Sequence, residues 1–179
     1  MKKPVTVFCA SSTQVDSAFF DDALRLGKFL AAHGYRCVYG AGKVGLMGSL
    51  AEGVLSSGGE IVGVIPQKMV DMNLQHTALT DMIVTPNMNV RKETMIEMAD
   101  VVVALPGGAG TFEELLDAIS WKKLSLTSVK IVIYNQKNYF SPLLQMFQNA
   151  IDEQFMHKED MHLWSKADTF EQLQAEILK

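Results

Sequence analysis

The fold of this chain is decided by the stretch Val101-Val102-Val103-Ala104-Leu105-Pro106-Gly107-Gly108-Ala109-Gly110-Thr111-Phe112-Glu113-Glu114. It begins as a short β-branched run, typical of a buried strand, and passes through three glycines into residues with helical spacing. A strand that leads through a glycine-rich turn into a helix is half of a βαβ unit. The stretch therefore predicts an α/β protein with a mostly parallel sheet.

The same alternation runs along the whole chain. With Val101–Leu105, the strand candidates are Val5–Ala10, Arg36–Tyr39, Ile61–Ile65, Met82–Thr85 and Ile131–Tyr134. The helix candidates are Ser17–Ala32, Gly45–Ser57, Arg91–Ala99, Thr111–Leu124, Phe140–Glu153 and Phe170–Leu178. Six strands suffice for a doubly wound parallel sheet flanked by helices, which is the predicted fold class.

Two helix ends are marked by local signals. Gly34 follows His33 and is free to adopt the left-handed conformation that ends a helix. Thr169 and Gln172 form a capping box that starts the last helix. Six of the 11 methionines fall between Met69 and Met98, and they fit either simple core packing or a pocket or subunit contact.

Composition excludes several classes of function. The 179 residues, 48% of them hydrophobic, fit one domain over residues 1–179. The net charge of −4 argues against nucleic acid as a partner, and no apolar run approaches the ~20 residues that span a membrane. The N-terminus does not resemble a signal peptide, so we expect a cytoplasmic protein. Cys9 and Cys37 have no metal-ligand spacing and are expected to be buried, inert thiols.

The first glycine-rich turn, Gly40-Ala41-Gly42-Lys43-Val44-Gly45, has the form GxGxxG. A dinucleotide site would also place an acidic residue at the end of the following strand, which here ends Ile65-Pro66-Gln67. The P-loop spacing GxxxxGK[ST] is also absent. Neither NAD binding nor ATP hydrolysis is favoured by this turn.

The second turn indicates an anion site. Gly107, Gly108 and Gly110 let the backbone approach a ligand, and the start of the following helix offers unpaired N–H groups suited to phosphate. Alternatively, Thr111 and Glu114 are a capping box that serves only the helix terminus. A cap needs none of the three glycines, so the turn favours the phosphate interpretation.

Two adjacent cations, Arg91 and Lys92, stand in the first turn of a predicted helix. The helix dipole disfavours cations there, by about 0.3–1 kcal/mol each when exposed, so another group is expected to hold them. Arg91 offers a planar fork for a phosphate or carboxylate. A solvated charge pair is the alternative.

The second turn and several stretches before it resemble those of a known family. Pro106-Gly107-Gly108-Ala109-Gly110-Thr111-Phe112-Glu113-Glu114 matches the PGGxGTxxE signature of the Lonely Guy family, the cytokinin riboside 5′-monophosphate phosphoribohydrolases, often labelled possible lysine decarboxylases. Val7–Ser12, Gly45–Gly48 and Gly63–Pro66 also look like the family's early strands and turns. Asn89 stands where the family usually has His, and Gly40-Ala41-Gly42 stands where it has three consecutive glycines.

The resemblance implies a Rossmann-like homodimer that hydrolyses the N-glycosidic bond of AMP or N6-modified AMP. The products are a free base, adenine or a cytokinin, and ribose 5-phosphate, and neither a metal nor a cofactor is needed. The residues that match the family's catalytic pair are Arg91 and Glu114. The phosphate loop and nucleotide-binding residues implied are Gly107, Gly108, Gly110, Thr111, Lys92, Ser12, Gly42 and Met88.

The expected chemistry needs a carboxylate near the sugar and a proton donor near the departing base. We expect Glu114 to activate the attacking water and Arg91 to fix the substrate. Asp117, one turn along the helix from Glu113, is a candidate for the general acid, although a solvated helix face accounts for it equally well.

Two other functions compete with this hydrolase. One is a nucleotide-binding module of the same fold without turnover, since fold alone does not fix function. The other is lysine decarboxylation, which requires a Schiff-base lysine and a partner for the pyridinium nitrogen of pyridoxal phosphate. Neither residue can be identified in the sequence, so decarboxylation is disfavoured.

Overall fold

The computed structural model describes residues 3–179, which form a seven-stranded, all-parallel sheet in the order β4-β3-β2-β1-β5-β6-β7. The strands are β1 (Pro4–Phe8), β2 (Arg36–Tyr39), β3 (Glu60–Pro66), β4 (Asp81–Thr85), β5 (Val101–Ala104), β6 (Lys130–Tyr134) and β7 (Ser165–Ala167). The chain winds outward from β1 in one direction and then resumes at β5 in the other. The carboxyl ends of β1 and β5 therefore form the switch point at which such sheets bind ligands.

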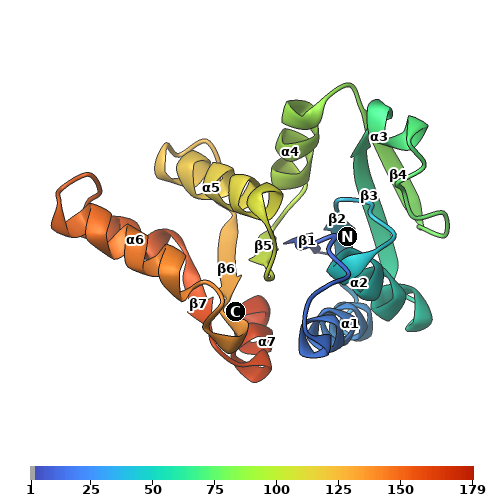
Figure 1. Cartoon of the computed structure of the whole chain (residues 1–179), viewed down its shortest axis with the longest axis horizontal. Coiled ribbons are helices and arrows are strands. Elements are labelled where there is room, and N and C mark those ends of the chain that lie inside the picture. Colours follow the sequence, from blue (N-terminus) through green and yellow to red (C-terminus); the bar gives the residue numbers. More distant parts are fainter. Residues whose placement is uncertain (1–2) are drawn as a thin grey trace.

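Helices cover both faces of this sheet (Figure 1). They are α1 (Ser17–Ala32), α2 (Gly45–Ser56), α3 (Gln67–Asp71), α4 (Met88–Glu97), α5 (Ala109–Lys123), α6 (Ser141–Asp152) and α7 (Phe170–Leu178). Two short 3₁₀ segments, η1 (Gln136–Asn138) and η2 (Lys158–Leu163), lie on either side of α6 in the chain. In Figure 1, α4, α5 and α6 lie on one side of the sheet and α1, α2 and α7 on the other.

The core is divided in two by the sheet because successive strand residues point to opposite faces. In β5, Val101 and Val103 contact the cluster beneath α1, α2 and α7, whereas Val102 and Ala104 contact the cluster beneath α4 and α5. All four side chains are buried. Strands covered on both faces explain the uninterrupted apolar runs from which the sheet was predicted.

The structure confirms the predicted fold class and all six predicted strands, whose ends lie within two residues of the predicted ones. The helices Ser17–Ala32 and Phe170–Leu178 have the predicted bounds. Gly34 has the left-handed conformation expected after the first of them, and Thr169 and Gln172 form the expected capping box before the second.

The sequence prediction missed some short elements and placed the start of one helix three residues too late. The strand β7 and the helix α3 were not predicted. They are only three and five residues long, too short to show a period. Helix α4 begins at Met88 instead of Arg91, because the Asn87 side chain accepts a hydrogen bond from the backbone N–H of Val90 and caps the helix earlier.

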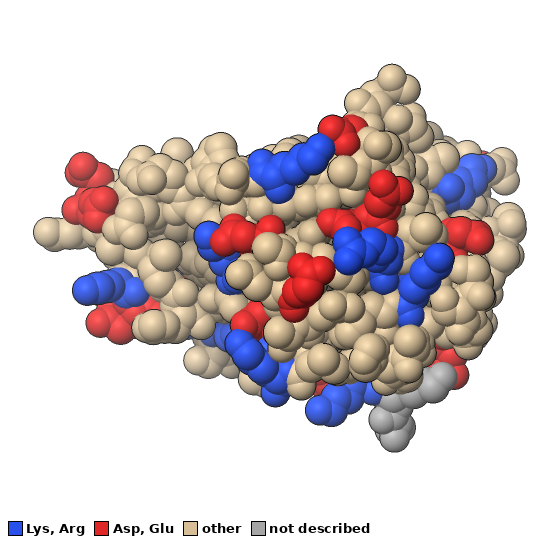
Figure 2. All heavy atoms as spheres, turned by 90° about the horizontal axis from the view of Figure 1, so that it is seen from below, with Lys and Arg blue, Asp and Glu red and all other residues tan. Residues whose placement is uncertain are grey.

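On the face shown in Figure 2, basic and acidic side chains are interspersed, and no continuous basic surface is visible. Within residues 3–179, no helix is long and apolar enough to cross a membrane. The same residues contain no group of three or more His, Cys, Asp or Glu side chains placed to hold a metal ion.

Candidate functional site

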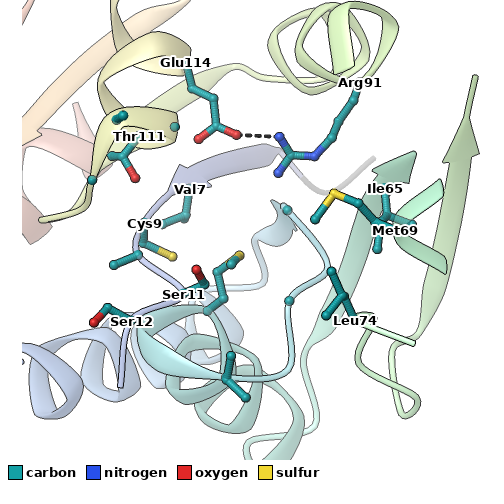
Figure 3. A pocket seen from close by; sticks show the side chains of 18 of the residues that line it. Val7, Cys9, Ser11, Ser12, Ile65, Met69, Leu74, Arg91, Thr111 and Glu114 are labelled. Atoms are coloured by element: carbon teal, nitrogen blue, oxygen red, sulfur yellow. Dashed lines mark hydrogen bonds and ion pairs between the residues drawn. The ribbon is translucent and has the colours of Figure 1, made fainter. Parts of the chain in front are cut away.

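A cavity of about 530 Å³ lies at the carboxyl ends of β1, β2 and β3, next to the first turns of α4 and α5 (Figure 3). Its position is the one expected for the ligand site of a doubly wound sheet. The residues that line it are Val7, Cys9, Ala10, Ser11, Ser12, Gly40, Gly42, Val44, Met47, Ile65, Met69, Leu74, Met88, Arg91, Gly108, Ala109, Gly110, Thr111 and Glu114.

The two residues that match the family's catalytic pair face each other in this cavity. Arg91 Nη1 donates a hydrogen bond to Glu114 Oε1 at 2.6 Å, and the two side chains are only 8% and 9% exposed (Figure 3). Arg91 Nε also donates to the backbone carbonyl of Val64 in β3 at 3.0 Å. The guanidinium is therefore fixed from two directions, and it holds the carboxylate at the cavity wall.

Helix α4 positions Arg91 at the cavity, and a hydrogen bond holds α4 against the sheet. The buried hydroxyl of Thr6 in β1 donates to the carbonyl of Met95 at 2.8 Å. The guanidinium lies so close to Gly40 that a Cβ atom there would be 2.2 Å from Arg91 Nη2. Gly40 was not among the predicted site residues, and the only sequence signal for it is its place in the first glycine-rich turn.

Burial governs the ionisation of Glu114. Loss of solvation raises the pKa of the carboxyl above its ordinary value of 4.5, although the charge and hydrogen bond of Arg91 act in the opposite direction. A carboxyl with a raised pKa, in a cavity and beside a fixed guanidinium, has the properties of a general base or acid.

The glycine-rich turn before α5 divides into two kinds of position. A Cβ atom on Gly108 or Gly110 would meet no atom within 4 Å, and both residues line the cavity, so these glycines leave space open. A Cβ on Gly107 would instead lie 2.0 Å from Thr111 Oγ1, so this glycine is required by the packing of the protein itself.

The capping-box alternative for Thr111 and Glu114 is wrong. Helix α5 begins at Ala109, with Gly108 as its N-cap and no side-chain cap, so Thr111 lies inside the first turn. Glu114 pairs with Arg91. Helix α5 thus presents uncapped N–H groups and the Thr111 side chain at the cavity, an arrangement that binds anions.

The solvated alternative for the two cations of α4 is also wrong, because both side chains are buried. Lys92 Nζ contacts Glu113 Oε1 at 2.6 Å and Asp117 Oδ2 at 2.7 Å. Lys92 and Asp117 are not among the residues that line the cavity, although the sequence offered both as site residues.

Of the remaining predicted site residues, Ser12, Gly42 and Met88 all line the cavity. Within the methionine-rich region Met69 to Met98, Met69 and Met88 line the cavity and Met95 lies in the core, so this region contributes to both a pocket and core packing. No sequence pattern pointed to Leu74, which reaches the cavity from the segment after α3, or to the apolar wall residues of β1 and β3.

Both cysteines are buried and free, as predicted. Burial raises the pKa of both thiols. For Cys9 it is the largest of several causes. Cys9 lines the cavity close enough to Glu114 for that carboxylate to raise its pKa further. It therefore stands in the cavity as a neutral, apolar group.

Tyr139 supports the glycine-rich turn from outside the cavity. Its hydroxyl donates to the carbonyl of Gly107 at 2.5 Å, and its ring stacks on Phe112 at 6.4 Å between centroids. Lys137 and Asn138, just before it, both have positive φ. Two consecutive non-glycine residues in this conformation are rare, so the chain holds an unfavourable backbone in the segment that presents Tyr139.

Known proteins resemble this chain over most of its length. The model of a family described as possible lysine decarboxylase matches residues 47–177. A protein of Rhodococcoides fascians named cytokinin riboside 5′-monophosphate phosphoribohydrolase is 39% identical over 155 residues, covering 86% of this chain and 78% of that protein. One of the same name from Arabidopsis thaliana is 33% identical over 171 residues, covering 96% and 75%.

Solved structures share the fold. The molybdenum cofactor carrier protein of Chlamydomonas reinhardtii superposes with a TM-score of 0.77 over 99% of this chain and 97% of its own, at 22% sequence identity. At that identity the likeness concerns the fold alone, and it leaves the chemistry of the cavity to be argued from the residues in it.

Proposed function

This chain belongs to the family described as possible lysine decarboxylases, the Lonely Guy family, and we propose that it hydrolyses the N-glycosidic bond of a nucleoside 5′-monophosphate. The substrate is AMP or an N6-modified AMP, and the products are a free base and ribose 5-phosphate. The observation that carries the proposal is the buried Arg91–Glu114 pair, one helical turn beyond an uncapped, glycine-rich helix start in the same cavity.

The phosphate is the part of the substrate that the protein recognises most simply. The start of α5, with its uncapped backbone N–H groups, and the Thr111 side chain both line the cavity, beside the space that Gly108 and Gly110 leave open. The partial positive charge of the helix start favours an anion there. Binding energy from the phosphate then holds the sugar in place for reaction.

The bond to be broken joins C1′ of the ribose to a ring nitrogen of the base. As it breaks, the sugar gains oxocarbenium character, which the Glu114 carboxylate stabilises. Glu114 accepts a proton from water, the water oxygen bonds to C1′, and the base leaves with the bonding electrons and takes up a proton from solvent, to which Glu114 then returns the proton that it accepted. Arg91 fixes the carboxylate and offers its remaining donors to the substrate.

The label of lysine decarboxylase finds no support in the cavity. A pyridoxal-phosphate enzyme needs a lysine to form the Schiff base. Within residues 3–179, the side chains that line the cavity include no lysine, and Lys92, the lysine next to Arg91, is instead paired with Glu113 and Asp117.

Incubation of the purified protein with AMP and with N6-isopentenyl AMP tests the proposal. Free base and ribose 5-phosphate are followed by chromatography, and we expect both in equal amounts from at least one substrate. Binding of AMP without release of base would instead favour the nucleotide-binding module.

We propose further that the protein is a homodimer. Leu116 in α5 and Leu124 and Leu126 after it are 41%, 66% and 69% exposed, and apolar side chains gathered on one helix and its continuation favour burial by a partner. Analytical ultracentrifugation is expected to give twice the chain mass of 19.8 kDa, and a monomer at micromolar concentration would refute this part of the proposal.

A further inference from the structure

Two ion pairs lie side by side between α4 and α5. Arg91 and Lys92 are neighbours on one helix, and Glu113 and Glu114 are neighbours on the other. Arg91 pairs with Glu114 and both line the cavity, whereas Lys92 pairs with Glu113 and neither of these two residues lines it. The second pair therefore has no direct access to a ligand.

Lys92 is held tightly for a lysine. Its side chain is 9% exposed, and its ammonium group contacts Glu113 at 2.6 Å and Asp117 at 2.7 Å. Glu113 and Asp117 are four residues apart on α5, where two like charges repel each other. The ammonium group removes that repulsion and joins α4 to α5 beside the cavity.

We propose that Lys92 is a positioning residue of the site: held between Glu113 and Asp117, it fixes α5 against α4 and so holds Glu114 in place beside Arg91. The effect of Lys92 on catalysis rests on the proposed function, whereas its effect on the position of Glu114 does not. It assigns Lys92 no contact with substrate.

The charges around Glu114 support this role. Arg91 pairs with it from α4, the charge of Lys92 acts on it from the same helix, Glu113 adjoins it on α5, and the Cys9 thiol lies close to it in the segment after β1. Burial is the largest cause of its raised pKa, Glu113 raises that pKa further, and Arg91 and Lys92 lower it. Loss of Lys92 removes one lowering charge and leaves Glu113 uncompensated.

The test is a pH titration of Glu114 by ¹³C NMR of the side-chain carboxyl, with the signal identified by its absence in Glu114→Gln. In Lys92→Met we expect the midpoint to rise by about half a pH unit or more, the scale for loss of a nearby charge. Lys92→Arg keeps the charge, so its Glu114 midpoint is expected to lie close to that of the wild type. Lys28→Met, at an exposed lysine of α1, is the matched control and is expected to leave the midpoint unchanged.

Glu113→Gln keeps the inference testable if Lys92→Met does not fold, because Glu113 is 55% exposed. In Glu113→Gln the titration midpoint of Glu114 is expected to fall, because a charge that raises it is removed. A Glu114 titration that is the same in the wild type, Lys92→Met and Glu113→Gln would overturn the inference, as would an equal shift in Lys28→Met.

The same variants separate this inference from the proposed function. If the wild type releases base, the acid limb of kcat/KM is expected to move with the NMR midpoint. If the midpoints move as expected and the wild type releases no base, the proposed function fails and the role of Lys92 toward Glu114 stands. If base is released and the midpoints do not move, the inference alone fails.

Discussion

Arg91 Nη1 lies 2.6 Å from Glu114 Oε1, although the two residues are 23 positions apart in the chain and belong to different helices. Burial of a charge is costly unless the charge is paired. Each side chain therefore offsets the cost of burying the other's charge in a cavity whose walls include Val7, Ile65 and Leu74. The pair holds the Glu114 carboxyl at 9% exposure beside a fixed guanidinium, and electrostatic interactions are stronger for groups shielded from solvent in this way.

Replacement of Arg91 by Lys is expected to lower kcat/KM by more than about 10²-fold, because Lys keeps the charge but loses the fork. The guanidinium bonds to both Glu114 and the carbonyl of Val64, and a single ammonium group cannot reproduce this geometry. Steady-state kinetics with AMP measure the effect. Arg25→Lys, at an arginine that is 51% exposed, is the control. Kinetics of Arg91→Lys close to those of the wild type would rule out the bidentate role.

The glycines before α5 are expected to respond differently to alanine. Gly107→Ala introduces a Cβ only 2.0 Å from Thr111 Oγ1, and overpacking of this kind costs about 1–3 kcal/mol of unfolding free energy. Gly108→Ala and Gly110→Ala meet no protein atom, so we expect normal thermal stability and weaker binding of AMP. Differential scanning fluorimetry and isothermal titration calorimetry measure the two effects. Undiminished AMP binding by both variants would place the phosphate elsewhere.

The pH dependence of the reaction follows from Glu114. Burial raises the pKa of this carboxyl above 4.5, so the group takes up its proton at a higher pH than an exposed glutamate does. Because the protonated form cannot act as a base, kcat/KM is expected to fall as the pH is lowered, with a midpoint above 4.5. A full pH profile checks this. Activity that persists unchanged below that value would show that the ionised carboxyl is not required.

Tyr139→Phe is expected to raise KM for the monophosphate several-fold with a smaller effect on kcat, because the carbonyl of Gly107 loses the donor that fixes the turn. Tyr139 is 39% exposed, so we expect a loss of stability below about 1.5 kcal/mol. Tyr35→Phe is the control, because it removes a hydrogen bond of 3.4 Å to Ile177 and neither residue lines the cavity. An unchanged KM in Tyr139→Phe would show that the turn does not depend on this bond.

The fold could be predicted because its signals are local. Buried parallel strands are apolar throughout, and the ends of α1 and α7 carry their own caps. The strand β7 escaped prediction because Ser165–Ala167 contains no β-branched or aromatic residue. Its place in the sheet comes from pairing with β6, a contact that no local pattern encodes.

The site could be predicted only in part because its contacts are tertiary. The pattern Thr-x-x-Glu at residues 111–114 fits both a capping box and a catalytic site, and the partner that decides between them, Arg91, lies on another helix. Arg91 and Lys92 are adjacent in sequence, yet about 100° apart around a helix of 3.6 residues per turn. Only the packing of α4 on α5 shows that the first faces the cavity and the second does not.

The most direct test of the central claim compares wild type with Glu114→Gln for AMP binding and base release in the same samples. We expect both proteins to bind AMP, and Glu114→Gln to release base more than about 10²-fold more slowly, because Gln keeps the shape and cannot take a proton. Glu93→Gln, at an exposed glutamate on α4, is the matched control. Base release by Glu114→Gln at the rate of the wild type, or AMP binding without release by the wild type, would contradict the account.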